Sequence, residues 1–313
     1  MSSSRHHRLF AYGTLREEHV RDALFGRRVP SAPAVLVGHV PAAARSATGP
    51  DAAAVPGGPT GRPTLECRID ARTEGTVLHL TDDELAAVDA HAAGHGVRRR
   101  VVLASGERAW THLDAGPLRS AARIVIVGDS IAYGRCDPRG GWAGHLAAAH
   151  IAANEAEHRL FNLAVPGASL ADVAAQTPAL LPARRPDTLL VAAGINDAAT
   201  GDGLGRLAEH LDSLAALALD AGARLVVAGP LWLDEEHAPS YEGLRFTLDR
   251  ALALRSALRA WCEARHVDHL DLWEPLRDRP ALFADGLHPT AAGHEEIHRF
   301  MARTAGARSA PPS

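Results

Sequence analysis

Five short apolar segments recur between residues 121 and 304, and longer segments with helical periodicity separate them. The apolar segments are RIVIV (123–127), RLFNLAV (159–165), DTLLVAA (187–193), RLVVAG (224–229) and VDHLDL (267–272). Strands that are apolar on both faces and alternate with helices are typical of a parallel sheet covered on both sides. This region therefore predicts a doubly wound α/β domain with a five-stranded parallel sheet.

Residues 8 to 115 have a different pattern, which predicts a small, mostly-β α+β domain. A loop rich in Pro, Gly and Ala covers 41–64, and only short helices fit, near 16–25 and 82–91. The predicted strands are RLFAYGTL (8–15), AVLVGHV (34–40), GTVLHL (75–80), VRRRVVL (97–103) and RAWTHLD (108–114). We place the domains at 1–118 and 119–306, and expect 307–313 to form a loose tail.

Composition narrows the classes of function. The formal net charge is −4, so no basic surface for nucleic acid or an anionic membrane is expected. All 33 basic residues are arginine, which excludes lysine Schiff-base chemistry and a standard phosphate-binding loop. Three distant cysteines and the absence of a long apolar run favour a cytoplasmic protein without a disulfide framework. The oligomeric state stays open.

Chemically useful residues follow four of the predicted strands. GDSIAYG carries Ser130, NLAVPG carries Gly167, GIND carries Asn196, and ADGLHP carries Asp285 and His288. In doubly wound sheets, ligands bind beyond the carboxyl ends of the strands. We therefore expect these residues to meet at one edge of the sheet.

These residue types suit acyl transfer. Ser130 is a weak nucleophile until a base such as His288 removes its proton, and Asp285 can orient that imidazole. An oxyanion hole needs donors, which the N–H groups of Ser130 and Gly167 and the side-chain amide of Asn196 can supply. Each motif alone also has a structural explanation, such as a helix cap at Ser130 or a turn at Asn196. Their joint occurrence in order, after strands, favours the catalytic reading.

The four motifs together resemble the four sequence blocks of the SGNH hydrolase (GDSL esterase/lipase) superfamily over residues 121–304. The resemblance implies a flavodoxin-like sheet and assigns catalysis to Ser130, Asp285 and His288, with Gly167 and Asn196 in the oxyanion hole. It also implies hydrolysis or transfer of an acyl ester of a small molecule through an acyl-enzyme at Ser130. No metal or organic cofactor is expected.

The segment HEEIH at 294–298 matches a zinc-binding pattern, HExxH. On a helix, His294 and His298 would lie on one face and could bind zinc. The segment is already explained as the last helix of the α/β domain, and no third ligand presents itself. We therefore predict a solvated helix face that bears His and Glu, and no metal.

The N-terminal segment AYGTL contains Tyr12, Gly13, Thr14 and Leu15, a glycine turn that could offer backbone N–H groups to a carboxylate. With the segments that follow, it resembles the γ-glutamylcyclotransferase-like (AIG2-like) fold over about residues 8–115. The resemblance makes Tyr12 to Leu15 a substrate loop.

One departure concerns the expected catalytic glutamate, because Ala92 stands at its position. Glu74, Glu84 or Glu107 could replace it only if the fold brought one of them to the turn. A degenerate domain with a binding, lid or docking role is therefore favoured. The alternatives are cleavage of a γ-glutamyl amide by this domain, a bifunctional tailoring enzyme, or two non-enzymatic binding modules.

Overall fold

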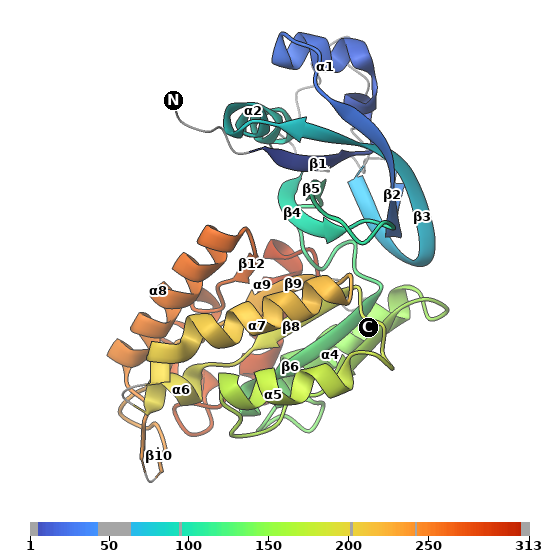
Figure 1. Ribbon diagram of the computed structural model, residues 1–313. Helices are drawn as coiled ribbons and strands as arrows, with labels where there is room; N and C mark the ends of the chain where they lie inside the picture. The colour runs from blue at the N-terminus through green and yellow to red at the C-terminus, as the bar shows by residue number, and fades with distance from the viewer. Residues whose placement is uncertain (1–5, 43–63, 94–95, 201–202, 242, 308–313) are drawn as a thin grey trace, which may run out of the picture. The chain divides into compact units, whose positions relative to one another are not determined.

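The structure is a computed structural model that describes residues 6–42, 64–93, 96–200, 203–241 and 243–307. The chain divides into two compact units between Ala115 and Gly116 (Figure 1). The boundary that we predicted from sequence follows residue 118. Residues 43–63 of the predicted loop and 308–313 of the predicted tail lie outside the described residues.

The C-terminal unit is built on a five-stranded sheet with the strand order β12-β9-β8-β6-β7. All its pairs are parallel, which confirms the predicted doubly wound α/β class. The strands are β6 (Arg123–Gly128), β7 (Arg159–Asn162), β8 (Thr188–Ala192), β9 (Arg224–Ala228) and β12 (Asp268–Leu270).

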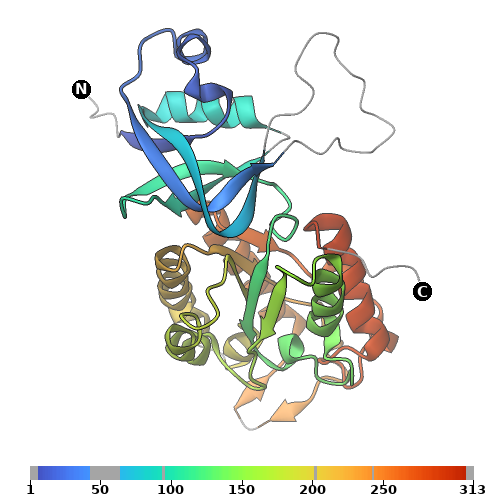
Figure 2. The same cartoon turned by 90° about the vertical axis from the view of Figure 1, so that its right-hand side faces the viewer.

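Helices cover both faces of this sheet. Successive side chains of each strand point to opposite faces, so the apolar residues of a strand such as β6 pack on both sides. On β6, Val125 and Val127 pack into one hydrophobic cluster, and Ile124 and Ile126 pack into the other. In Figure 2 the green α4 and red α9 lie on one side of the sheet, and helices coloured yellow-green to orange lie on the other. The long helices are α4 (Gly141–Ala153), α5 (Leu170–Leu180), α7 (Leu207–Asp220), α8 (Leu248–Arg265) and α9 (Ala291–Thr304).

Short elements complete the unit. Two of them, α3 (Ser130–Tyr133) and α6 (Ile195–Ala199), begin directly beyond the carboxyl ends of β6 and β8. A two-stranded hairpin of β10 (Ser240–Tyr241) and β11 (Leu244–Arg245) was not predicted. The 3₁₀ helices of this unit are η2 (Gly203–Arg206), η3 (Glu274–Leu276) and η4 (Pro280–Leu282).

Among the described residues, the length and hydropathy of the helices identify no candidate membrane span.

The N-terminal unit has a five-stranded sheet with the order β2-β3-β1-β5-β4. Its pairs are antiparallel except for β1 with β5, which is parallel. A bridge between Leu36 and Leu103, beside a hydrogen bond from the Ala104 N–H to the Val35 carbonyl (2.8 Å), joins β2 to the end of β4. The sheet therefore closes on itself. Its elements are β1 (His7–Ala11), β2 (Ser31–Ala42), β3 (Thr64–Leu80), β4 (Val97–Val102), β5 (Arg108–Leu113), η1 (Thr14–Arg16), α1 (Glu18–Phe25) and α2 (Asp82–Ala92).

Strand β3 begins earlier than predicted, at Thr64 instead of residue 75. Its first half, TLECRIDARTE, is mostly polar and partly exposed, so it lacks the apolar run by which we recognised the second half. Pairing with β2 stabilises this extension, and the register runs to Ala42 opposite Thr64.

Candidate active site

The carboxyl ends of three neighbouring strands bring the predicted site residues toward one edge of the C-terminal sheet. The Val165 N–H donates to the Gly128 carbonyl (2.9 Å), which ties the loop after β7 to the end of β6. The Asp129 N–H donates to the Ala192 carbonyl (3.2 Å), which ties β6 to β8. The segments that carry Ser130, Gly167 and Asn196 are therefore adjacent.

Ser130, His288 and Asp285 form one hydrogen-bonded chain. The Oγ atom of Ser130 lies 2.9 Å from Nε2 of His288, and Nδ1 of His288 lies 2.7 Å from Oδ2 of Asp285. The Asp285 carboxylate also accepts the backbone N–H groups of Leu287 (3.2 Å) and His288 (2.8 Å). Ser130 and His288 are buried, at 6% and 1% exposure. This is the geometry that a serine nucleophile, a histidine base and an orienting carboxylate require.

The electrostatics of this chain favour a neutral imidazole. Burial lowers the pKa of His288, against the opposing effects of the hydrogen bond and charge of Asp285. Burial opposes ionisation of Asp285, but hydrogen bonds from the His288 N–H and ring outweigh it and lower the carboxyl pKa. Because Asp285 accepts the Nδ1–H, the lone pair of His288 lies on Nε2 and faces the Ser130 hydroxyl.

The helix cap at the end of β6 is Asp129, not Ser130. The Asp129 carboxylate accepts the Ile131 N–H (2.9 Å), and Ser130 is the first residue of α3. The structural alternative for Ser130 is therefore wrong. Asp129 is buried, and this burial raises the pKa of its carboxyl group to about 7, although backbone N–H groups donate to it.

Three N–H donors lie on the segments around Ser130. Within the described part of the chain, the backbone N–H groups of Ser130 and Gly167 have no hydrogen-bond acceptor. The Asn196 side chain donates one amide hydrogen to the Ala168 carbonyl (3.0 Å) and keeps its second. Unsatisfied donors on adjacent loops are what an oxyanion hole requires.

Gly167 adopts a φ of +84°, which favours glycine, and the Ala168 N–H donates back to the Val165 carbonyl (3.1 Å). With Pro166 before it, this matches a type II turn. A Cβ atom at Gly167 would meet no atom within 4 Å. The requirement for glycine is therefore conformational, and the space beside it is open.

The HEEIH segment lies in α9, but its histidines are buried, so the predicted solvated face is wrong. His294 accepts the Trp142 N–H at Nδ1 (3.2 Å) and lies 3.0 Å from the Arg135 carbonyl at Nε2. It thereby links α9 to α4 and to the loop that follows Ser130. The described residues hold no group of three or more His, Cys, Asp or Glu side chains placed to bind a metal.

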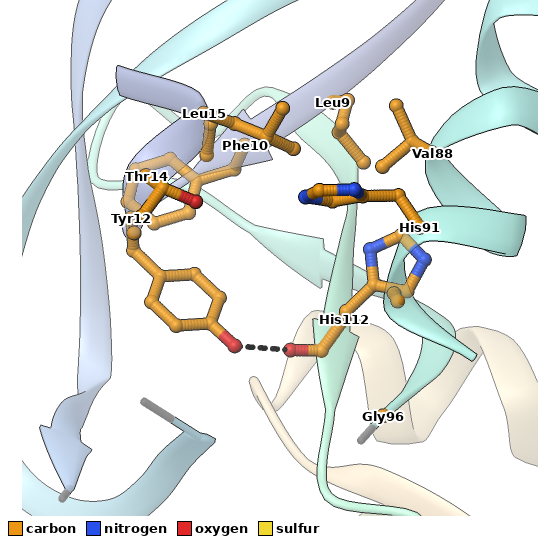
Figure 3. A pocket seen from close by; sticks show the side chains of 12 residues that line it. Leu9, Phe10, Tyr12, Thr14, Leu15, Val88, His91, Gly96 and His112 are labelled. Carbon is orange, nitrogen blue, oxygen red and sulfur yellow. Dashed lines mark hydrogen bonds between the residues drawn. The ribbon is translucent and has the colours of Figure 1, made fainter. Parts of the chain in front are cut away.

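A cavity of about 90 Å³ lies within the N-terminal unit, beside the Tyr12–Leu15 turn. In Figure 3 Tyr12 and Thr14 lie on one side of it, and His91 and His112 lie opposite. The Tyr12 hydroxyl donates to the His112 carbonyl (3.0 Å), and burial raises the pKa of Tyr12 to about 12. The described residues that line it are Leu9, Phe10, Ala11, Tyr12, Gly13, Thr14, Leu15, Val88, His91, Ala92, Gly96 and His112.

Among the residues that the structure describes, none that line this cavity carries a carboxylate. Ala92 contributes to the cavity wall, whereas Glu74, Glu84 and Glu107 do not. Glu84 accepts the Thr81 N–H (2.8 Å) and pairs with an arginine of the loop after α1. Two acids act on lining residues from outside the wall: Asp89, whose Oδ1 lies 3.0 Å from Nε2 of His112, and Asp114, whose charge adds to the effect of burial on the Tyr12 pKa. Sequence reasoning missed His112, because only the strand pairing brings it opposite the turn.

Comparison with known proteins identifies the family of the C-terminal unit. The sequence model of the "GDSL-like Lipase/Acylhydrolase family" matches residues 126–296, more than half of the 313 residues. Esterase TesA of Pseudomonas aeruginosa is 29% identical over 123 residues, which cover 39% of this chain. The chain spans 60% of the length of that relative.

The chain is also similar to solved structures, at identities of about 20%. A lipase/acylhydrolase from Enterococcus faecalis has 21% identity, covers 61% of this chain and 100% of its own, and has a TM-score of 0.49. A mutant of Axe2, an acetyl-xylooligosaccharide esterase from Geobacillus, has 18% identity, coverages of 61% and 97%, and a TM-score of 0.48. The match to the family model, over more than half of the sequence, decides the assignment: the chain belongs to the GDSL-like lipase/acylhydrolase family, whose members are hydrolases acting on ester bonds.

Proposed function

We propose that the C-terminal unit hydrolyses, or transfers, an acyl ester of a small molecule through an acyl-enzyme at Ser130. The observation that carries this proposal is the continuous chain from the Ser130 hydroxyl to Nε2 of His288 (2.9 Å) and from Nδ1 to Asp285 (2.7 Å). The family match and the name of the TesA relative, an esterase, support ester bonds as the target.

In the proposed reaction, His288 removes the Ser130 proton while Oγ attacks the ester carbonyl. The N–H groups of Ser130 and Gly167 and the Asn196 amide stabilise the oxyanion that forms. His288 then donates the proton to the departing alcohol, which leaves an acyl ester on Ser130. Water or another alcohol repeats the sequence and releases the acyl group. Asp285 keeps the imidazole oriented throughout.

A fluorophosphonate probe, read by intact mass, tests this proposal. The wild type is expected to gain one adduct, and Ser130→Ala none. Ser256→Ala is the matched control, since this serine lies on the exposed side of α8 and its hydroxyl donates to the Leu252 carbonyl. An unlabelled wild type, or a Ser130→Ala variant that still takes one adduct, would contradict the assignment.

We also propose that the N-terminal unit is an AIG2-like unit that binds a small molecule but lacks cyclotransferase activity. The support is the cavity at the Tyr12–Leu15 turn, because its described lining residues include Ala92 and no Asp or Glu. A carboxylate would be needed there to move protons during cyclisation.

The test incubates γ-glutamyl-p-nitroanilide with the Ser130→Ala protein, so that esterase activity does not interfere. No 5-oxoproline is expected from this protein, and Ala92→Glu is expected to release it. Release by the Ser130→Ala protein, lost on Tyr12→Phe, would establish the cyclotransferase alternative instead.

A further inference from the structure

The loop that carries Gly167 is held by two consecutive residues of helix α6. The Asn196 amide donates to the Ala168 carbonyl (3.0 Å), and the Asp197 carboxylate accepts the Leu170 N–H (2.9 and 3.2 Å). These contacts lie on either side of Ser169. The loop after β7 is thereby attached to the short helix that supplies the third donor of the proposed oxyanion hole.

Helix α5 does not need Asp197 to begin. Ser169 is its N-cap, and Ser169 and Asp172 form a capping box in which the Asp172 N–H reaches the Ser169 hydroxyl (3.2 Å). The Asp172 carboxylate accepts the Ser169 N–H in return (2.9 Å). The bond from Leu170 to Asp197 therefore goes beyond capping, because it connects α5 and its preceding loop to a different strand end.

The carboxylate of Asp197 is held at an energetic cost. The residue is 8% exposed, and burial raises its pKa, against the effect of the hydrogen bond from Leu170. Leu170, its partner, is fully buried. A buried N–H without a hydrogen-bond acceptor is destabilising. The Asp197 carboxylate therefore stabilises this arrangement by accepting the buried Leu170 N–H.

We propose that Asp197 is a positioning residue for the oxyanion hole, holding the Gly167 loop against α6 so that the Gly167 N–H and the Asn196 amide point at one oxygen. The inference rests on the proposed esterase function and adds a residue that does not touch the substrate. A displacement of about 1 Å in such donors is enough to lower turnover by about 10²-fold.

The test measures kcat and KM for p-nitrophenyl acetate at a temperature well below the unfolding midpoints of all variants. Asp197→Ala is expected to lower kcat by about 10²-fold with KM within about threefold, since only transition-state contacts are lost. Asp197→Asn keeps an oxygen acceptor for Leu170 and is expected to retain kcat within about fivefold. Asp172→Ala is the matched control: it removes the capping box of the same helix and leaves kcat unchanged.

Several results would overturn the inference. A folded Asp197→Ala protein with kcat within about threefold of the wild type contradicts it, as does an equal loss of kcat in Asp172→Ala. If Asp197→Ala does not fold, Asp197→Ser replaces it, because a serine hydroxyl is polar but too short to reach Leu170. A wild type that neither takes the fluorophosphonate nor cleaves the ester overturns the proposed function itself.

Discussion

The Nε2 atom of His288 lies 2.9 Å from the Oγ atom of Ser130, although 158 residues separate them in the chain. Parallel strands explain this distance, because every crossover returns the chain to the same edge of the sheet. Ser130 follows β6, the strand between β8 and β7, and His288 follows the 3₁₀ turns beyond β12.

The first prediction concerns the acid limb of the pH–rate profile. His288 accepts a proton only when neutral, so kcat/KM for p-nitrophenyl acetate is expected to fall as the pH drops through the pKa of His288. Burial lowers that pKa, so the limb lies below the ordinary value of 6.5. Stopped-flow or steady-state assays across the acid range measure it, and a midpoint above 6.5 would contradict this account.

The second prediction concerns Asp285→Asn. The charge of Asp285 raises the pKa of His288, so its removal is expected to move the acid limb to lower pH. The amide also favours the wrong imidazole tautomer, so kcat is expected to fall by about 10³- to 10⁴-fold. The same pH series measures both effects. An unchanged midpoint together with near-normal kcat would show that Asp285 does not orient His288.

The third prediction concerns Asn196→Ala, which removes one donor of the proposed oxyanion hole. We expect kcat to fall by about 10²- to 10³-fold with little change in KM, because the lost bond forms mainly in the transition state. Asn154→Ala is the control, since Asn154 is a partly exposed C-cap residue of α4. A loss of less than about threefold in Asn196→Ala would remove this residue from the oxyanion hole.

The fourth prediction links Asp129 to stability. The pKa of the Asp129 carboxyl group is about 7 in the folded protein, above its ordinary value of 3.8. The contribution of this group to the free energy of unfolding is therefore fully present below pH 3.8 and is lost as the pH rises through about 7. Asp129→Asn keeps a good helix cap and cannot ionise. The unfolding temperature of the variant minus that of the wild type is therefore expected to increase across this window. A difference that stays constant with pH would refute the linkage.

The fifth prediction concerns a buried ion pair at the start of two strands. Arg224 and Asp268 are nearly inaccessible, and their two hydrogen bonds measure 2.6 and 2.9 Å. Arg224→Met leaves a buried carboxylate without this partner and is expected to cost about 3 to 5 kcal/mol. The double variant Arg224→Met with Asp268→Leu is expected to recover part of that loss in denaturant unfolding. A single variant as stable as the wild type would contradict the prediction.

The strands of the C-terminal sheet could be predicted from the sequence because helices cover both faces of the sheet. In β6, the four consecutive residues IVIV (124–127) are all apolar and buried, which distinguishes this strand from an amphipathic helix. The first half of β3 could not be predicted as a strand, because its residues are mostly polar and pairing with β2 stabilises it. The burial of His294 could not be predicted either, since it depends on contacts with α4 and with the loop after α3.

By itself, the sequence determined the α/β class of the C-terminal unit, the order of the strand-end motifs and the residue types that suit acyl transfer. These properties follow from local periodicity and from residue chemistry. Only the tertiary structure decided that Asp129 is the cap of α3, that Asp197 holds the Leu170 N–H, and that His112 lies opposite the Tyr12 turn. Such contacts join residues from different elements, and their distances depend on how those elements pack.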